Sequence, residues 1–149
     1  MNELRHLLVI PDGNRRFADK HNISYDTIYT VVAVNTTVKL IEYILLDTKI
    51  KELTIFMISR NNVLKRTKEN LDPIFNAQTA AFERLAKNRK LTEGRVRFNF
   101  IGDTKILPEK YNNVISKLAS KTKNSSNKIC NFLVAYDGAS ELIETIKKL

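Results

Sequence analysis

The sequence is short of the residues that build a disulfide framework or a zinc site. Cys130 is its only cysteine, and it falls in an apolar, strand-like segment. A single thiol can form neither an intrachain disulfide nor a cysteine-based zinc site. We therefore expect Cys130 to be a small core residue.

Long hydrophobic runs are also lacking. A membrane-spanning helix needs about 18 or more consecutive apolar residues, and the longest apolar stretch here is interrupted by Asn35, Lys39 and Glu42. The apolar stretch before Pro11 is too short for a secretory signal peptide. We expect a cytoplasmic protein that contacts a membrane only peripherally, at its surface.

Positive charge is in excess. The 149 residues include 25 Lys and Arg against 16 Asp and Glu, a formal net charge of +9. This excess favours an anionic partner such as a phosphorylated small molecule, an acidic membrane surface or a nucleic acid. The lysines are spread along the chain without a known nucleic-acid-binding motif, which makes nucleic acid the least favoured of the three.

Hydrophobic periodicity predicts a single domain, residues 1–149, in which strands alternate with helices. Strands are expected at residues 5–10, 53–58, 96–101 and 129–136. Helices are expected at residues 15–21, 27–47, 72–90, 107–120 and 140–149, with Pro73 in a first turn and a loop over residues 59–67. This order predicts an α/β fold with a central, mostly parallel sheet and helices on both faces. Ligands of such folds bind at the carboxyl ends of the strands.

The residues after the first predicted strand suggest phosphate chemistry. Asp12, Gly13 and Asn14 form a strong turn signal, and two arginines follow at once. A strand that turns into a helix directs backbone N–H groups at one spot, which favours an anion. Arg15 and Arg16 suit phosphate oxygens, and a carboxylate beside them suits a Mg²⁺ ion that bridges to a diphosphate. The alternative is an ordinary strand-to-helix turn in which Asn14 caps the helix.

This segment resembles the first motif of the cis-prenyltransferases, the undecaprenyl and dehydrodolichyl diphosphate synthase family. Three later segments are similar to family segments in the same order: residues 52–62, with a Ser-x-x-Asn loop, residues 96–103, ending in Ile-Gly-Asp, and residues 132–143. The resemblance implies the undecaprenyl diphosphate synthase fold. It also implies condensation of isopentenyl diphosphate onto an allylic diphosphate to give Z-polyprenyl diphosphate for carrier-lipid synthesis, with Mg²⁺ as cofactor.

The resemblance also implies roles for individual residues and a partner. Asp12 would bind Mg²⁺. The catalytic residues would be Asp12, Asn14, Ser59 and Asn62, and Gly13, Asn14 and Arg16 would bind the diphosphate. By their charge, Arg15, Arg60, Lys65 and Arg66 are further candidates for diphosphate binding, and the alternative for the last three is a solvated basic loop. The helices at residues 28–46 and 72–90 would wall a hydrophobic tunnel for the prenyl chain. The assembly would be a homodimer or a heteromer with a related subunit.

The sequence departs from the family pattern at several positions. Tyr25 and Tyr29 stand where the family has an arginine and a histidine, Val63 replaces an aromatic residue, and Asp137 and Ala139 replace a glycine and an arginine. The family's Arg-x-Ser type motif for isopentenyl diphosphate is also missing, so we expect a chain truncated at its C-terminal side. Two alternatives stay open: a non-catalytic partner subunit or pseudoenzyme of the same fold, and a basic nucleic-acid-binding α/β domain.

Overall fold

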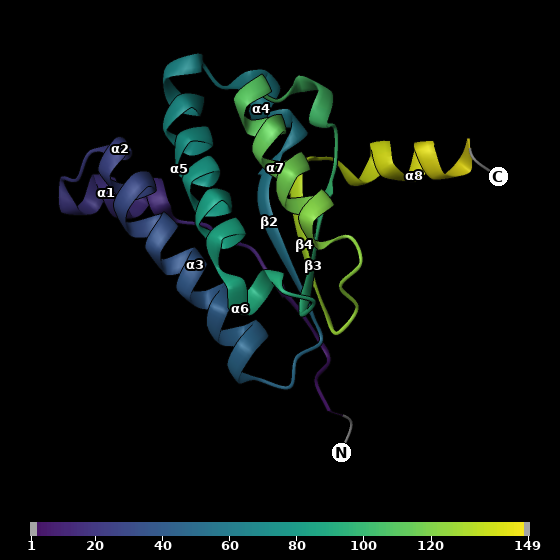
Figure 1. The fold of residues 1–149 in the computed structure, drawn as a ribbon. Helices are drawn as coiled ribbons and strands as arrows, with labels where there is room; N and C mark the ends of the chain where they lie inside the picture. Colours follow the sequence, from purple (N-terminus) through teal and green to yellow (C-terminus); the bar gives the residue numbers. More distant parts are fainter. Residues whose placement is uncertain (1–2, 148–149) are drawn as a thin grey trace.

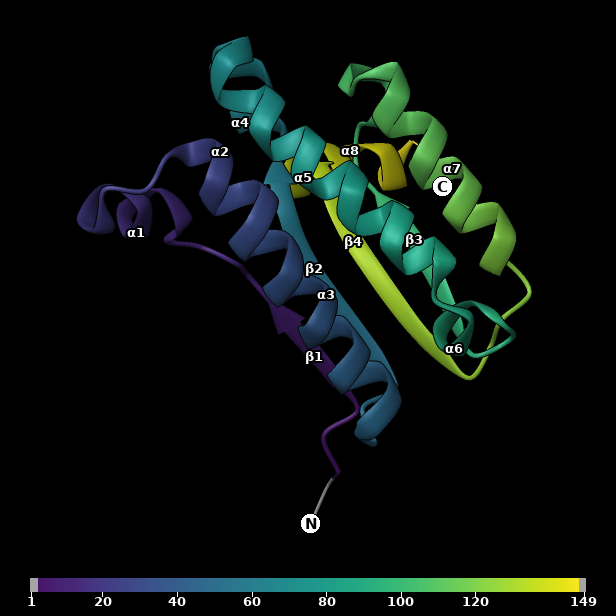
Figure 2. The ribbon, with the colours of Figure 1, turned by 60° about the vertical axis from the view of Figure 1, so that its left-hand side comes forward.

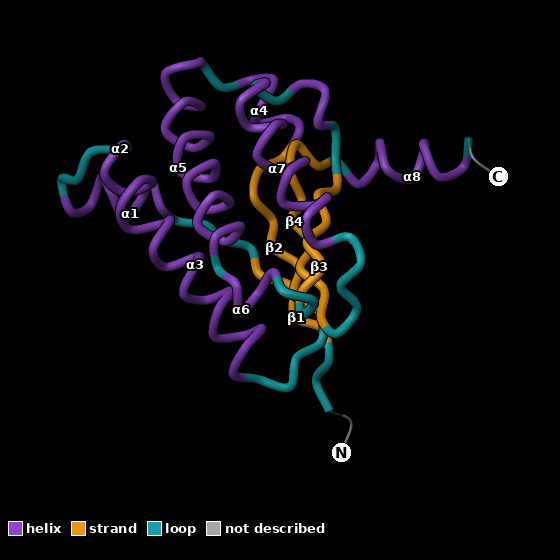
Figure 3. Tube along the Cα trace, in the orientation of Figure 1, coloured by secondary structure: helices purple, strands orange, loops and turns teal. Residues whose placement is uncertain are grey.

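A computed structural model describes residues 3–147. At its centre is a sheet of four parallel strands in the order β1–β2–β4–β3. The strands, drawn in orange in Figure 3, are β1 (His6–Val9), β2 (Glu52–Ser59), β3 (Val96–Ile101) and β4 (Lys128–Tyr136). All four predicted strands and their parallel arrangement are confirmed.

Helices make the connections between the strands. The chain passes from β1 to β2 through α1 (Asn14–His21), α2 (Tyr25–Thr27), η1 (Ile28–Ala33), α3 (Val34–Glu42) and η2 (Tyr43–Asp47). The last four are one continuous helical segment, in which η1 and η2 are π-helical. The remaining helices are α4 (Arg60–Lys65), α5 (Lys68–Lys87), α6 (Arg89–Thr92), the 3₁₀ turn η3 (Thr104–Ile106), α7 (Glu109–Thr122) and α8 (Gly138–Ile146). Residues 148–149 of the last predicted helix lie outside the described residues.

Two of the local predictions are wrong. The expected loop at residues 59–67 contains α4, because the Ser59 hydroxyl accepts a hydrogen bond from the Asn62 N–H at 3.0 Å and caps the helix. Pro73 is not in a first turn, since α5 already begins at Lys68. Inside the helix, the proline ring has no N–H to offer the carbonyl one turn earlier.

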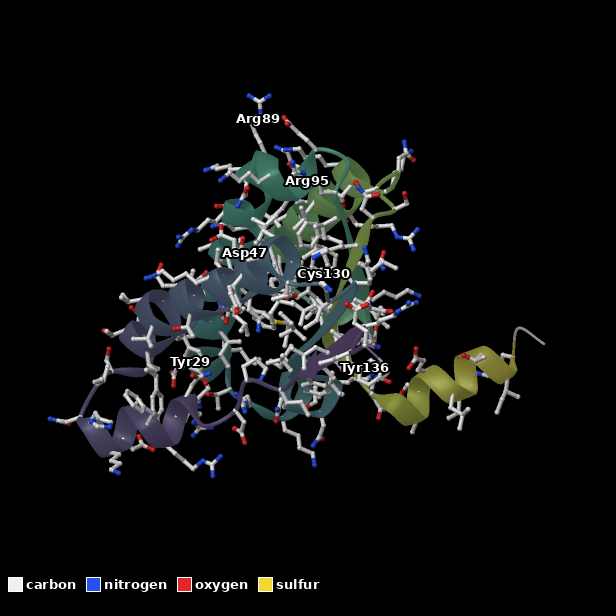
Figure 4. All side chains as sticks on the ribbon, turned by 90° about the horizontal axis from the view of Figure 1, so that it is seen from below. Tyr29, Asp47, Arg89, Arg95, Cys130 and Tyr136 are labelled. Atoms are coloured by element: carbon white, nitrogen blue, oxygen red, sulfur yellow. The ribbon has the colours of Figure 1, made fainter. Side chains whose placement is uncertain are left out.

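The three long helical segments lie side by side over one face of the sheet (Figure 2). Phe82 of α5 is the centre of the core between them, with its ring centroid 4.9 Å from that of Phe132 on β4 and 5.7 Å from that of Tyr111 on α7. Cys130, also on β4, is fully buried in this core (Figure 4), and burial raises the pKa of its thiol. The prediction that Cys130 is a core residue is confirmed.

The opposite face of the sheet carries a row of polar side chains. Asn131 donates hydrogen bonds to Glu52 Oε1 at 2.6 Å and to Thr54 Oγ1 at 3.3 Å, and accepts one from Asn99 at 2.8 Å. His6 Nε2 reaches Thr54 Oγ1 at 2.8 Å, so the row crosses all four strands. These side chains satisfy one another's hydrogen-bonding groups across the strands. Within residues 3–147 no long helix covers this face, and α8 projects away from the body of the domain (Figure 1). The helices predicted on both faces of the sheet are thus seen on one face of the described structure.

The continuous helical segment Tyr25–Asp47 is long and apolar enough to cross a membrane, by length and composition alone. It has 23 residues and a mean hydropathy of 1.3. In the described structure one side of it packs against α5, and Ile28, Val38 and Ile41 are at most 1% exposed. One side of the segment therefore belongs to the core, while Val31, Val32 and Tyr43 on its other sides are exposed.

Candidate functional site

A cavity of about 360 Å³ opens at the carboxyl ends of β1 and β2. Its walls come from η1, α3, α5 and β2, and most of the interior is apolar. The interior is lined by Tyr29, Ala33, Val34, Thr37, Phe56, Met57, Ile58, Ile74, Ala77, Gln78 and Ala81. Residues 10–16, which connect β1 to α1, lie at its mouth with Asn62 and Arg66. The cavity therefore joins a polar, basic entrance to a hydrophobic interior.

Asp12 is held in place by both of its carboxylate oxygens. Oδ1 accepts the backbone N–H of Gly13 at 2.6 Å, and Oδ2 accepts a hydrogen bond from Arg16 Nη2 at 3.0 Å. The turn depends on Gly13, whose φ of +91° is in the left-handed region. The carboxylate is thereby fixed beside a guanidinium at the entrance of the cavity.

The first turn of α1 faces the same entrance. Gly13 is the N-cap, and no side chain caps the helix. Asn14 is the first helical residue and lines the cavity, so the alternative in which Asn14 acts as the cap is wrong. The uncapped N–H groups and Arg15 and Arg16 add positive potential at this point.

α4 forms the other side of the entrance. Asn62 and Arg66 line the cavity, whereas Ser59, Arg60 and Lys65 do not. Ser59 uses its side chain to cap α4, and Arg60 Nε donates to Asp103 Oδ2 at 3.2 Å. The structure thus gathers seven predicted site residues at one cavity: Asp12, Gly13, Asn14, Arg15, Arg16, Asn62 and Arg66. Ser59, Arg60 and Lys65 stay outside its lining.

Of the three basic residues predicted in this stretch, Arg66 lines the cavity, whereas Arg60 and Lys65 do not. Residues four apart share one face of a helix, and Arg66 follows Asn62 by four positions at the end of α4. Which basic residue meets the cavity therefore depends on the phase of α4, where the sequence predicted a loop.

The ends of β3 and β4 form a separate polar cluster. Asp137 caps α8 by accepting hydrogen bonds from the Ser140 hydroxyl at 2.6 Å and N–H at 3.2 Å. The hydroxyl bond is the main reason why the pKa of Asp137 is lowered. Tyr136, at the base of α8 (Figure 4), donates to Glu141 Oε2 at 2.6 Å, and this bond raises the pKa of Tyr136. These residues do not line the cavity.

The donor set at the entrance fits a Mg²⁺ ion that is shared with a ligand. Among the described residues no group of three His, Cys, Asp or Glu side chains is placed to hold a metal ion. Asp12 is the carboxylate at the entrance. Mg²⁺ is often bound by one or two carboxylates together with substrate phosphates, so Asp12 fits as the protein ligand of a Mg²⁺–diphosphate complex.

The prenyltransferase family model described as undecaprenyl diphosphate synthase matches residues 10–149. The chain belongs to the undecaprenyl diphosphate synthase family. The family and the fold predicted from the sequence are therefore confirmed. The chain spans about 60% of the length of the curated relatives that it matches, and these include archaeal and bacterial members.

Two relatives and two solved structures illustrate the family similarity. The chain is 34% identical over 144 residues to the tritrans,polycis-undecaprenyl-diphosphate synthase (geranylgeranyl-diphosphate specific) of Pyrobaculum aerophilum, covering 97% of this chain and 60% of that protein. It is 32% identical to the isoprenyl transferase of Campylobacter jejuni, covering 100% of this chain and 65% of the relative. A solved structure of a probable undecaprenyl diphosphate synthase from Campylobacter jejuni is 27% identical, with a TM-score of 0.71, and the match covers 99% of this chain and 62% of that one. Lavandulyl diphosphate synthase from Lavandula x intermedia, in complex with dimethylallyl diphosphate, shares the fold at a TM-score of 0.86 and 24% identity, covering 97% of this chain and 60% of that one.

Tyr25 and Tyr29, two of the departures from the family pattern, lie differently relative to the cavity. Tyr29 lies between the long helix and α1 (Figure 4) and lines the cavity. Tyr25 is outside the lining, but its ring contacts Arg15, which is inside it. Tyr29 therefore lines the cavity directly, Tyr25 contacts a lining residue, and neither adds positive charge.

Proposed function

We propose that this chain forms the allylic diphosphate site of a prenyltransferase that condenses isopentenyl diphosphate onto an allylic diphosphate to give a Z-polyprenyl diphosphate. The observation that carries the proposal is a cavity that joins a basic, carboxylate-bearing entrance to an apolar interior. An allylic diphosphate has the same division, with a charged head and a hydrocarbon tail. The names of the curated relatives support the same reaction class.

The diphosphate would bind where positive charge converges at the entrance. Arg15 and Arg16 offer planar guanidinium groups that suit phosphate oxygens, and Arg66 lies across the entrance on α4. Asn14 adds the start of an uncapped helix. Asp12 would hold Mg²⁺, which supplies charge neutralisation to a departing diphosphate.

The apolar interior would hold the prenyl chain and keep water away from the reacting carbon. Small side chains leave room for it, in particular Ala33 on η1 and Ala77 and Ala81 on α5. In the proposed reaction the allylic carbon–oxygen bond breaks, the diphosphate leaves, a carbon–carbon bond forms to isopentenyl diphosphate, and that unit loses a proton. Exclusion of water protects the positive charge that develops on the allylic carbon.

The proposal is tested by titration calorimetry with farnesyl diphosphate, with and without Mg²⁺. We expect the wild type to bind in a Mg²⁺-dependent manner and Asp12→Ala to lose the Mg²⁺-dependent part. Asp72→Ala is the matched control, because Asp72 is an exposed aspartate on α5 outside the cavity lining. Absence of binding by the wild type would contradict the proposal and leave a non-catalytic subunit of the same fold.

A further inference from the structure

A half-buried tyrosine joins two charged residues of α1 beside the entrance. The Tyr25 hydroxyl donates a hydrogen bond to Asp19 Oδ1 at 2.8 Å. Its ring lies beneath the Arg15 guanidinium, with Cζ 5.3 Å from the ring centroid. This distance is within the range of a cation–π interaction. Arg15 lines the cavity and Tyr25 does not.

Arg15 and Asp19 make no ion pair with each other. They are four residues apart on one helix, a spacing at which opposite charges can pair. In the part of the chain that the structure describes, Asp12 and Arg16 make such a pair, but Arg15 and Asp19 do not. Tyr25 engages both partners instead, Asp19 through its hydroxyl and Arg15 through its ring.

We propose that Tyr25 is a positioning residue for the diphosphate site, an inference that rests on the function proposed above. It holds the Arg15 guanidinium at the entrance and keeps the Asp19 carboxylate from neutralising it. A cation–π contact uses the charge of the guanidinium and leaves its N–H groups free as donors. Arg15 is thereby oriented in advance and remains able to bind phosphate oxygens.

The first test is a double-mutant cycle on the full chain. Calorimetry at low ionic strength measures the affinity of each variant for inorganic diphosphate in the presence of Mg²⁺. We expect Tyr25→Leu to weaken binding by about two- to five-fold, the value of an exposed cation–π interaction. Arg15→Ala should weaken it by at least as much. The double variant should bind no worse than Arg15→Ala alone, because Tyr25 acts only through Arg15.

The outcomes separate this inference from the proposed function. A wild type that binds diphosphate together with an unchanged Tyr25→Leu variant would overturn only the role of Tyr25. A loss of equal size in the wild-type and Arg15→Ala backgrounds would show a general structural effect and would also overturn it. A wild type that binds no diphosphate would overturn the proposed function, and this inference with it.

A second variant tests the hydroxyl while keeping the ring. Tyr25→Phe preserves the packing and the cation–π contact but releases Asp19, which can then pair with Arg15. We expect binding to fall by about twofold at low salt, the size of an exposed pair at this spacing. Adding Asp19→Asn to Tyr25→Phe should restore binding, whereas no recovery would overturn the proposed role of the hydroxyl.

Discussion

Arg16 donates a hydrogen bond from Nη2 to Asp12 Oδ2 at 3.0 Å, one helical turn back along the chain. Both side chains are 79% exposed. An ion pair so open to water contributes little to folding stability. Its effect is on geometry, because it holds a guanidinium and a carboxylate together at the entrance of the cavity.

Replacing Arg16 is therefore expected to affect binding and not folding. Arg16→Ala should weaken binding of Mg²⁺–diphosphate by about 10- to 100-fold, since hydrogen bonds to charged groups are worth about 1.5–3 kcal/mol. Its free energy of unfolding should stay within about 0.5 kcal/mol of the wild type. Calorimetry and urea denaturation measure the two quantities.

The matched control is Arg89→Ala. Arg89 pairs with Glu93 at the same spacing, on the far side of the domain from Tyr29 (Figure 4). This change should leave diphosphate binding as it is. An equal loss in both variants would mean that general surface charge attracts the ligand.

Binding of the hydrocarbon tail should depend on Ala81. This side chain is 3% exposed and lines the interior from α5. Ala81→Leu should weaken farnesyl diphosphate binding by about tenfold, since each excluded methylene-sized group is worth about 0.8 kcal/mol. Binding of inorganic diphosphate should not change, because that ligand has no tail.

Ala80→Leu is the control for this change, on the exposed side of the same helix. It should bind both ligands like the wild type. If Ala81→Leu weakened both ligands equally, the tail would not lie along α5.

Gly102 should be the glycine least tolerant of substitution in the described chain. A Cβ atom there would lie 1.9 Å from the carbonyl oxygen of Val134, and φ is +135°. Gly102→Ala should lower the free energy of unfolding by more than about 3 kcal/mol, because backbone must move to relieve the overlap. Gly94→Ala is the comparison, at φ +72° with open space around it, and should cost about 1–2 kcal/mol. Similar midpoints in urea for the two variants would contradict the close approach at Gly102.

The polar row across the sheet should contribute to stability through Asn131. Its side chain is 8% exposed and makes hydrogen bonds to three neighbours. Asn131→Ala should destabilise the domain by about 1–3 kcal/mol, because it leaves the buried hydroxyl of Thr54 and the amide of Asn99 short of a partner. Asn113→Ala, at an exposed position of α7, should stay within about 0.5 kcal/mol. Equal thermal midpoints for the two variants would show that water replaces the hydrogen bonds of Asn131 without loss of stability.

The fold was largely predictable because short apolar runs mark the strands and longer periodic segments mark the helices between them. The missed helix α4 shows the limit of such patterns. With six residues it is too short to display a hydrophobic periodicity, and its signal in the sequence is the Ser59 side chain that caps it. The uncovered face could not be predicted either. Its character depends on Asn99, Asn131 and Thr54 meeting across three strands, and strand order is not contained in any one segment.

The residues of the site likewise fall into those that the sequence predicts and those that only the structure reveals. Residues 12–16 were predictable because they are contiguous and carry their chemistry in one turn of chain. Arg66 depends on the phase of a helix that the pattern did not reveal. The contact of Tyr25 with Arg15 depends on the chain reversal after α1, where Asn22 adopts a left-handed conformation with φ +53°. Residue patterns identify the groups, and tertiary geometry decides which of them meet.

The entrance of the cavity is attached to the rest of the domain through a weak part of the sheet. β1 has four residues and pairs with β2 alone in the described sheet, at its edge. Segments with few packing contacts open at a lower free energy than the core of a domain. We expect β1 to be such a segment, and its opening would release residues 10–13 and the first turn of α1 while the other three strands stay paired. A ligand bound there would stabilise the pairing of β1 with β2 and slow amide exchange along β1.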